Sequence, residues 1–159
     1  MVTVPGTEPQ LRRASTDDAA IITSLVRESY HHYISRMGKE PGPMLEDYVR
    51  AIEVDGVWVA ECGPEIVGVL VMKISQGRCL MDNVAVHPDW QGRGISRLLI
   101  DHAEQYTGEQ GFEELQLYTH ECMTESYSLY LALGFSEIDR REELGYQRIY
   151  MAKQVAMPA

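Results

Sequence analysis

The sequence lacks long hydrophobic runs and has little positive charge. No apolar stretch approaches the roughly 20 residues that a membrane-spanning helix needs, and residues 1–10 lack the basic start and apolar block of a secretory signal. Lysine and arginine number 14 against 24 aspartates and glutamates, so the formal net charge is -10. This charge disfavours nucleic acid and anionic membranes as partners. We therefore predict a cytoplasmic protein that binds neither nucleic acid nor a membrane.

Cysteine is also scarce. Cys62, Cys79 and Cys122 are an odd number of widely spaced residues without a C-x-x-C pair. This pattern predicts reduced thiols rather than a disulfide framework or a metal site. The pair His31-His32 does not give the His-x-x-x-His spacing of a helical zinc site. No metal is expected.

The chain has enough apolar residues to build one core. With 159 residues and 45% hydrophobic content, we predict a single domain over residues 1–159 with its core at about 9–154. One predicted helix follows Ser15 and places Ala20, Ile21, Ser24, Leu25 and Glu28 on one apolar face. Residues 30–43 are predicted to be mostly loop. Further helices are predicted at 44–52, 94–110 and 125–133, and strands at 11–14, 57–61, 66–74, 78–86, 115–119, 135–139 and 148–153.

The order of these elements predicts how the strands pair. Consecutive strands before residue 86 favour antiparallel neighbours, whereas a helical crossover after residue 86 requires a parallel pair. The fold class predicted is therefore α/β of the α+β type, with a mixed, mostly antiparallel central sheet flanked by helices.

The most informative stretch is residues 83–96, which reads as a strand, a turn and the start of a helix. Gly92 and Gly94 leave backbone N–H groups without Cβ atoms in the way, at the positive end of a helix, and Arg93 adds a cation. These features are typical of a pyrophosphate site. The alternative is a tight turn whose glycines only relieve strain. No Lys-Ser or Lys-Thr follows the glycines, which disfavours a phosphate-loop nucleotide enzyme.

Three motifs resemble the GNAT superfamily of N-acetyltransferases. Residues 91–96 match Gln/Arg-x-x-Gly-x-Gly/Ala, except that Ser96 stands at the last position. Residues 84–88 match the apolar-Ala-Val-x-Pro run of the preceding strand, and residues 129–135 match a Leu-Tyr helix that ends in Gly-Phe. The resemblance implies the acyl-CoA N-acyltransferase fold, with a splayed parallel pair. It also implies transfer of an acetyl group from acetyl-CoA to a primary amine, by direct attack in a ternary complex and without a metal.

The resemblance also assigns roles to residues. The backbone N–H of Val84 would polarise the thioester carbonyl, and Tyr130 would protonate the leaving thiolate. Met123 stands where the family often has an asparagine that binds pantetheine, so Thr124, Glu125 or Ser126 would have to compensate. The predicted cofactor-binding residues are Val84, Ala85, Val86, Gln91, Gly92, Arg93, Gly94, Ile95, Ser96, Ser126 and Tyr130.

The general base and the acceptor site are less defined. Asp82 lies two residues before Val84 and would act as base through a water; a structural polar role is the equal alternative, and His120 and Glu121 are other candidates. The residues predicted to contact the acceptor are Tyr30, Tyr33, His120 and Glu121. Tyr146 and Arg148 would line the same cleft.

Partners follow from the same resemblance. The acceptor is a small-molecule amine or a peptide amine, and a homodimer is expected by analogy. The sequence does not identify the acceptor, and it leaves both acetyl and other acyl groups open as the group transferred. An acyl-CoA-binding regulatory or sensor module with little catalysis is the alternative, favoured by Met123 and by a base one carbon shorter than glutamate. Cys122 has no activating partner in any motif, which disfavours a thiol nucleophile.

Overall fold

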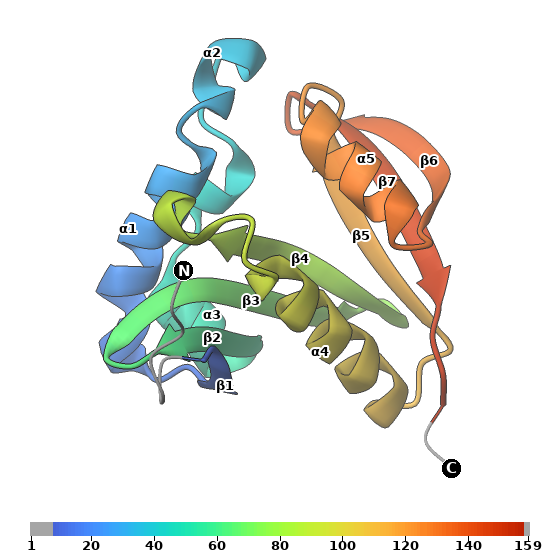
Figure 1. Cartoon of the computed structure of the whole chain (residues 1–159). Helices are drawn as coiled ribbons and strands as arrows, with labels where there is room; N and C mark the ends of the chain where they lie inside the picture. The colour runs from blue at the N-terminus through green and yellow to red at the C-terminus, as the bar shows by residue number, and fades with distance from the viewer. Residues whose placement is uncertain (1–7, 158–159) are drawn as a thin grey trace. The chain divides into compact units, whose positions relative to one another are not determined.

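The structure is a computed structural model, and it describes residues 8–157. Figure 1 labels its elements along the chain. The strands are β1 (Gln10–Arg13), β2 (Gly56–Cys62), β3 (Glu65–Ser75), β4 (Arg78–Val86), β5 (Glu114–His120), β6 (Ser136–Glu143) and β7 (Tyr146–Gln154). The helices are α1 (Ala19–Tyr30), α2 (Tyr33–Met37), α3 (Tyr48–Val54), α4 (Ile95–Glu109) and α5 (Thr124–Ala132), with 3-10 turns η1 (Thr16–Asp18), η2 (Gly42–Leu45) and η3 (Pro88–Trp90).

The strands form one mixed sheet in the order β1-β2-β3-β4-β5-β7-β6. The β1/β2, β2/β3, β5/β7 and β6/β7 pairs are antiparallel, and the β4/β5 pair is parallel. The predicted fold class is therefore confirmed. Parallel pairing covers Cys79–Met81 with Leu115–Leu117 only, although β4 continues to Val86 and β5 to His120.

The chain divides into two compact units. Unit 1 contains the residues up to Met72 together with Asn83–His102, and unit 2 contains Lys73–Asp82 and the residues from Ala103 onward. The boundaries fall inside β3, β4 and α4. The single N-acetyltransferase domain over residues 1–159 stays a prediction.

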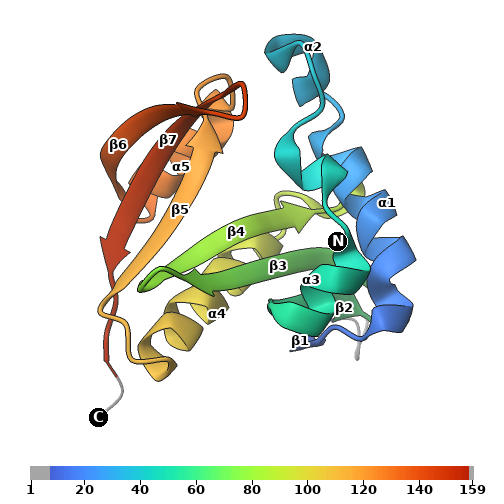
Figure 2. The ribbon, with the colours of Figure 1, turned by 180° about the vertical axis from the view of Figure 1, so that it is seen from behind.

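Unit 1 has helices on both faces of its strands, because the strand residues alternate between two apolar surfaces. Val57, Val59, Val69 and Val71 join buried residues of α1 and α3 in one core. On the other face, Gly68 lies so close to α4 that a Cβ there would stand 3.0 Å from Leu99. The opposed views of Figures 1 and 2 show α1 and α3 on one side of these strands and α4 on the other.

In unit 2, α5 and the last part of α4 lie near the strands β5 and β7. Leu115, Leu117 and Met151 are almost completely buried. An ion pair of 3.0 Å joins Lys153 of β7 to Glu104 of α4. The core of this unit therefore uses the alternate residues of β5 and β7, and leaves the other face of those strands to polar and aromatic side chains.

The apolar face predicted for α1 is not the face that packs into the core. The buried residues of the helix are Ala19, Ile22, Leu25 and Val26. Ile21 is 51% exposed, and of the predicted set only Leu25 is buried. Two faces of this helix carry apolar residues at helical spacing, so periodicity alone does not choose between them.

The predicted loop at 30–43 and the predicted helix at 44–52 are also partly wrong. The first contains α2, which ends at Gly38 with φ 77, and η2 runs from Gly42 to Leu45. The following helix begins only at Tyr48, because Asp47 accepts a hydrogen bond from the backbone N–H of Arg50 and so caps it.

The last two strands are longer than predicted. They meet at a two-residue turn, Leu144-Gly145, in which both residues have positive φ. That geometry is typical of a tight hairpin, in which Asn-Gly is the usual sequence. Leucine at the first position hides the turn from sequence analysis.

Candidate active site

The turn between β4 and α4 presents backbone N–H groups to solvent. Gly92 and Gly94 have φ of 78 and 82, and an added Cβ at either would have nothing within 4 Å. Residues 91–94 are exposed, whereas Ile95 is 1% exposed and fixes the start of the helix in the core. The Gly94 carbonyl accepts from Leu98 N at 3.1 Å, so the N–H groups of the first turn have no acceptor within the helix. Free N–H groups at the start of a helix are suited to an anion.

Side chains hold this turn in place. The Gln91 amide donates to the Val86 carbonyl at 3.2 Å, which ties the turn to the end of β4. The Arg93 guanidinium lies 4.7 Å from the centroid of the Trp90 ring. The cation that sequence analysis predicted for a pyrophosphate therefore sits beside the glycines on an aromatic support, a partner that the sequence did not predict.

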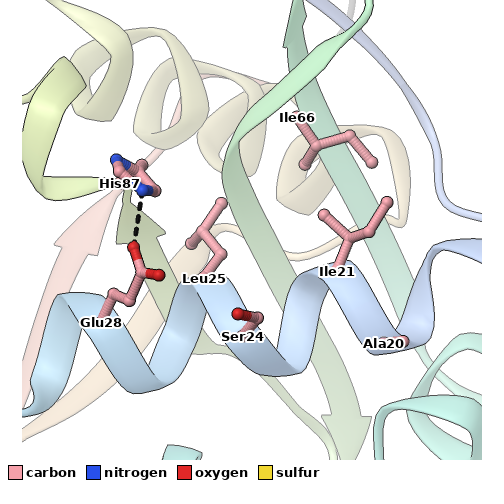
Figure 3. Close-up of a pocket in the computed structure, with 7 residues that line it drawn as sticks. All are labelled: Ala20, Ile21, Ser24, Leu25, Glu28, Ile66 and His87. Carbon is pink, nitrogen blue, oxygen red and sulfur yellow. Dashed lines mark ion pairs between the residues drawn. The ribbon is translucent and has the colours of Figure 1, made fainter.

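A shallow pocket adjoins the start of the turn. Its volume is about 340 Å³, and Figure 3 shows α1 side chains facing Ile66 and His87 across it. His87 Nε2 lies 2.6 Å from Glu28, and its Nδ1 accepts from Asp89 N at 3.1 Å. The apolar face predicted for α1 lines this pocket, with Ala20, Ile21, Ser24, Leu25 and Glu28.

A buried hydrogen-bond network holds β4 beside the predicted acceptor loop. The Tyr30 hydroxyl donates to Asn83 Oδ1 at 2.7 Å and lies 3.1 Å from the Val84 carbonyl oxygen. Asn83, 4% exposed, donates through Nδ2 to the Tyr48 hydroxyl at 3.0 Å. Tyr48 in turn donates to the Pro43 carbonyl at 2.6 Å. Tyr30 therefore supports β4 in this unit, and its contact with an acceptor stays a prediction.

Tyr33, the second predicted acceptor residue of this segment, is 6% exposed. Its ring lies 3.9 Å from that of His32 and 6.0 Å from that of Tyr30, between ring centroids. It belongs to an aromatic cluster at the end of α1 and the start of α2. Acceptor binding by Tyr33 also stays a prediction.

Asp82, the candidate base, has a hydrogen bond and an ion pair within unit 2. The Tyr118 hydroxyl donates to Asp82 Oδ1 at 3.1 Å, and Lys73 Nζ lies 3.4 Å from Oδ2. The side chain is 14% exposed. Along β4, the residues at 78, 80, 82 and 84 are all less buried than their neighbours, so Asp82 and Val84 share one face as predicted.

Tyr130 and Ser126 both lie on α5. Tyr130 is 9% exposed, and its ring contacts Phe135 edge-on with 5.7 Å between centroids. Ser126 is half-buried. Met123 is 7% exposed, and its sulfur accepts from the Thr119 hydroxyl at 3.7 Å. Met123 therefore serves the core of unit 2 at the position where the family often has a polar asparagine.

His120 lies at the end of β5 and orders the backbone around it. Its Nδ1 lies 3.1 Å from Cys122 N, and its Nε2 lies 3.2 Å from Gln147 N. Its ring meets Tyr146 edge-on, and the adjacent Glu121 is exposed. These contacts join β5 to the start of β7. Proton transfer by His120 or Glu121 stays a prediction.

The cysteines are free thiols. Burial raises the pKa of the Cys62 thiol, with nearby Arg93 acting in the opposite direction, and burial likewise raises the pKa of Cys79. In residues 8–157, no cluster of three or more His, Cys, Asp or Glu side chains has the arrangement of a metal site. None of the helices described in that range is long and apolar enough to cross a membrane. A cytoplasmic location stays a prediction.

The predicted site residues thus fall into the two units. Unit 1 brings together Val84, Ala85, Val86, Gln91, Gly92, Arg93, Gly94, Ile95 and Ser96, and also contains Tyr30 and Tyr33. Unit 2 contains Asp82, His120, Glu121, Ser126 and Tyr130. Sequence analysis missed Asn83, Tyr48 and His87, and its only signal for Asn83 was a polar residue in an apolar strand.

Curated relatives are N-acetyltransferases. N-acetyltransferase 8B from Rattus norvegicus is 31% identical over 88 residues, which is 52% of this chain and 40% of that protein. N-acetyltransferase 8 from Mus musculus is 22% identical over 120 residues, 71% of this chain and 52% of that protein. The matches to these two proteins thus span about half of their length or less.

Solved structures share the fold over nearly the whole chain. The ribosomal-protein-S18-alanine N-acetyltransferase from Escherichia coli has a TM-score of 0.76 at 17% identity, covering 96% of this chain and 97% of that one. The PaiA N-acetyltransferase from Thermoplasma acidophilum, solved in complex with coenzyme A, has a TM-score of 0.72 at 19% identity, covering 92% and 99%.

A family model assigns the chain directly. The model of the Acetyltransferase (GNAT) family matches residues 18–135. That span includes β4, the glycine turn, α4 and the Tyr130 helix. It follows that this chain belongs to the GNAT family of acetyltransferases.

Proposed function

We propose that the chain transfers an acetyl group from acetyl-CoA to a primary amine by direct attack of the amine in a ternary complex. Acetyl-CoA supplies the thioester. The chain has to bind the pyrophosphate, polarise the thioester carbonyl, accept a proton from the amine and give one to the departing sulfur. The acceptor is a small-molecule amine or a peptide amine, and a homodimer stays a prediction.

The observation that carries this proposal is the exposed glycine turn at the start of α4. Two glycines with positive φ have open space where a side chain would stand, and the neighbouring Arg93 carries a charge that matches a diphosphate. If the glycines only relieved backbone strain, the turn would not need the exposed Arg93 stacked on the Trp90 ring. The donors present therefore fit the anionic part of acetyl-CoA.

Three further groups receive roles in the same proposal. The backbone N–H of Val84 stabilises the developing oxyanion, and the Tyr130 hydroxyl gives its proton to the thiolate. Asp82 takes the proton of the amine through a water, since its side chain is short. Lys73 and Tyr118 support this role because they hold the carboxylate in one orientation.

The glycine turn is tested with a matched pair of variants. Gly94→Glu should weaken acetyl-CoA binding by about a hundredfold, because a carboxylate repels the pyrophosphate and a side chain strains a residue with positive φ. Gly77→Glu is the control: Gly77 lies in the β3–β4 turn, has φ +74 and also has nothing within 4 Å of an added Cβ. Isothermal titration calorimetry measures both affinities.

Turnover is measured by thiol release from acetyl-CoA with a panel of primary amines. Unchanged affinity in a folded Gly94→Glu variant would remove the turn from the cofactor site. Tight acetyl-CoA binding by the wild type without turnover of any amine would favour an acyl-CoA-binding regulatory or sensor module. Turnover that Gly94→Glu abolishes and Gly77→Glu preserves supports the enzyme.

A further inference from the structure

The polar face of the unit 2 strands carries an arginine among tyrosines. Register places Tyr118 of β5 opposite Tyr150 of β7, and His120 opposite Arg148. The Arg148 guanidinium lies 4.3 Å from the centroid of the Tyr118 ring and 5.6 Å from that of Tyr146. Arg148 is half-buried. The strand pairing therefore fixes a cation against aromatic rings.

The charge of Arg148 is not balanced by a carboxylate. By contrast, two arginines of the adjacent strand β6 pair with acidic side chains. Arg140 lies 2.9 Å from Glu137, and Arg141 lies 2.7 Å from Asp139. Among residues 8–157, Arg148 forms no ion pair with an aspartate or glutamate, and its polar partner is the Tyr150 hydroxyl. A partly desolvated guanidinium without a counter-ion attracts an anion, and its planar fork matches a carboxylate.

The acidic residue near Arg148 in this hairpin, Glu143, already has a hydrogen-bond partner. Glu143 accepts a hydrogen bond from the Tyr150 hydroxyl. Burial is the largest cause of the raised pKa of Tyr150, and the bond to Glu143 adds to it, whereas Arg148 acts in the lowering direction. Tyr150 therefore stays protonated and keeps Glu143 as its acceptor. The Arg148 guanidinium also hydrogen-bonds this hydroxyl, but its five N–H donors leave others for a ligand.

The same tyrosine that supports Arg148 also contacts the candidate base. The Tyr118 ring lies under the guanidinium, and its hydroxyl donates to Asp82. The Tyr118 side chain thus lies between the Arg148 guanidinium and the Asp82 carboxylate. A small molecule with an amine at one end and a carboxylate at the other would place the carboxylate at Arg148 and the amine toward Asp82, beside the Lys73 that already neighbours Asp82 at 3.4 Å.

We propose that Arg148 binds a carboxylate of the acceptor, so that the acceptor is an amine that also carries a carboxylate, as in an amino acid. This inference rests on the proposed acetyl transfer. The amine lies toward Asp82, and the carboxylate forms paired hydrogen bonds with the guanidinium above Tyr118. Arg148 is a specificity-determining residue and takes no part in proton transfer.

The test compares acceptors that differ only in the carboxylate. The panel contains α-, β- and γ-amino acids, the carboxamide of each, and ethanolamine phosphate. The wild type should give a kcat/KM at least about tenfold higher for an acid than for its amide. Arg148→Gln should lower kcat/KM for the acid by about tenfold or more and leave the amide within about twofold.

Two more variants define the interaction. Arg148→Lys should restore only part of the activity on acids, because lysine has charge but no planar fork. Arg141→Gln is the matched control, since Arg141 also stacks on a tyrosine of β7 but already pairs with Asp139. It should leave the acid-to-amide ratio unchanged.

The outcomes separate this inference from the proposed function. Absence of turnover with every amine contradicts acetyl transfer, and direct calorimetric titration of the amino acids into wild type and Arg148→Gln then still tests the site. Equal kcat/KM for acids and amides in the wild type, an equal loss for both in Arg148→Gln, or a preference for ethanolamine phosphate would overturn the inference.

Discussion

Tyr130 is the side chain on which the proposed chemistry depends most directly. It lies on α5, is 9% exposed and packs against the Phe135 ring. The packing uses the apolar part of the ring, whereas proton donation uses the hydroxyl. Removal of the hydroxyl alone therefore separates catalysis from packing.

Tyr130→Phe should lower kcat by about a hundredfold, the lower end of the range for general acid catalysis, with little change in acetyl-CoA affinity. Steady-state thiol release and calorimetry measure the two quantities. Tyr127→Phe is the control on the same helix, because its hydroxyl bonds to Glu137 on the surface. Equal turnover by wild type and Tyr130→Phe would remove Tyr130 from its role.

At the scale of elements, Asn83 joins three segments of unit 1. It lies in β4, accepts from Tyr30 at the end of α1 and donates to Tyr48 at the start of α3. A buried amide with both ends satisfied stabilises this arrangement, whereas a buried hydroxyl left without its partner is costly. The strand that carries Val84 is thus fixed by side chains on its helical side.

Asn83→Ala should lower the free energy of unfolding by about 2–3 kcal/mol, since it opens a small cavity and removes one hydrogen bond from each of the Tyr30 and Tyr48 hydroxyls. Urea denaturation measures the change. Gln105→Ala is the control: its amide bonds only to Glu109 on the exposed face of α4, and we expect a change within about 0.5 kcal/mol. A loss for Asn83→Ala no larger than that of the control would show that the network does not support the fold.

At the scale of the whole molecule, the formal net charge of -10 means that most carboxylates repel one another. Asp18 is an exception, because Arg12 binds it at 2.8 Å and also contacts Glu61. Hydrogen bonds from Arg12, opposed by burial and helped by Ser15, lower the pKa of Asp18 to about 2. This group links β1, η1 and β2.

The Asp18 contribution to stability should depend on pH. Its pKa in the folded chain lies below the ordinary value of 3.8, so the stabilisation is fully present above about pH 4 and is lost as the pH falls toward 2. Asp18→Asn should cost about 1–2 kcal/mol at pH 7, discounted because Arg12 is partly exposed, and almost nothing near pH 2. Urea unfolding at both pH values checks this, with exposed Asp17→Asn as control; a pH-independent difference would contradict the ion pair.

Local signals predicted the sheet and the glycine turn well. Gly92 and Gly94 leave a mark in the sequence because only glycine adopts their φ without strain. The helical crossover after Val86 likewise predicts that the strand that follows the helix runs parallel to β4. These features depend on short stretches, and the structure has them where the sequence predicted.

Features that depend on tertiary partners were not predicted. The core face of α1 was missed because Ile21 and Ile22 both fit a helical apolar face, and only the sheet beneath decides between them. The environment of Arg148 depends on the register between β5 and β7, which lie far apart in the sequence. Similarly, the partners of Asn83 come from segments that are 53 and 35 residues away.

The contact of Arg93 with Trp90 has a consequence for the entropy of ligand capture. A long arginine side chain in solvent samples many rotamers, and it loses about 2 kcal/mol of that freedom when a ligand fixes it. The indole ring beneath Arg93 restricts those rotamers in the ligand-free chain. In the proposed cofactor site, part of the ordering cost is thus met during folding, before a diphosphate binds.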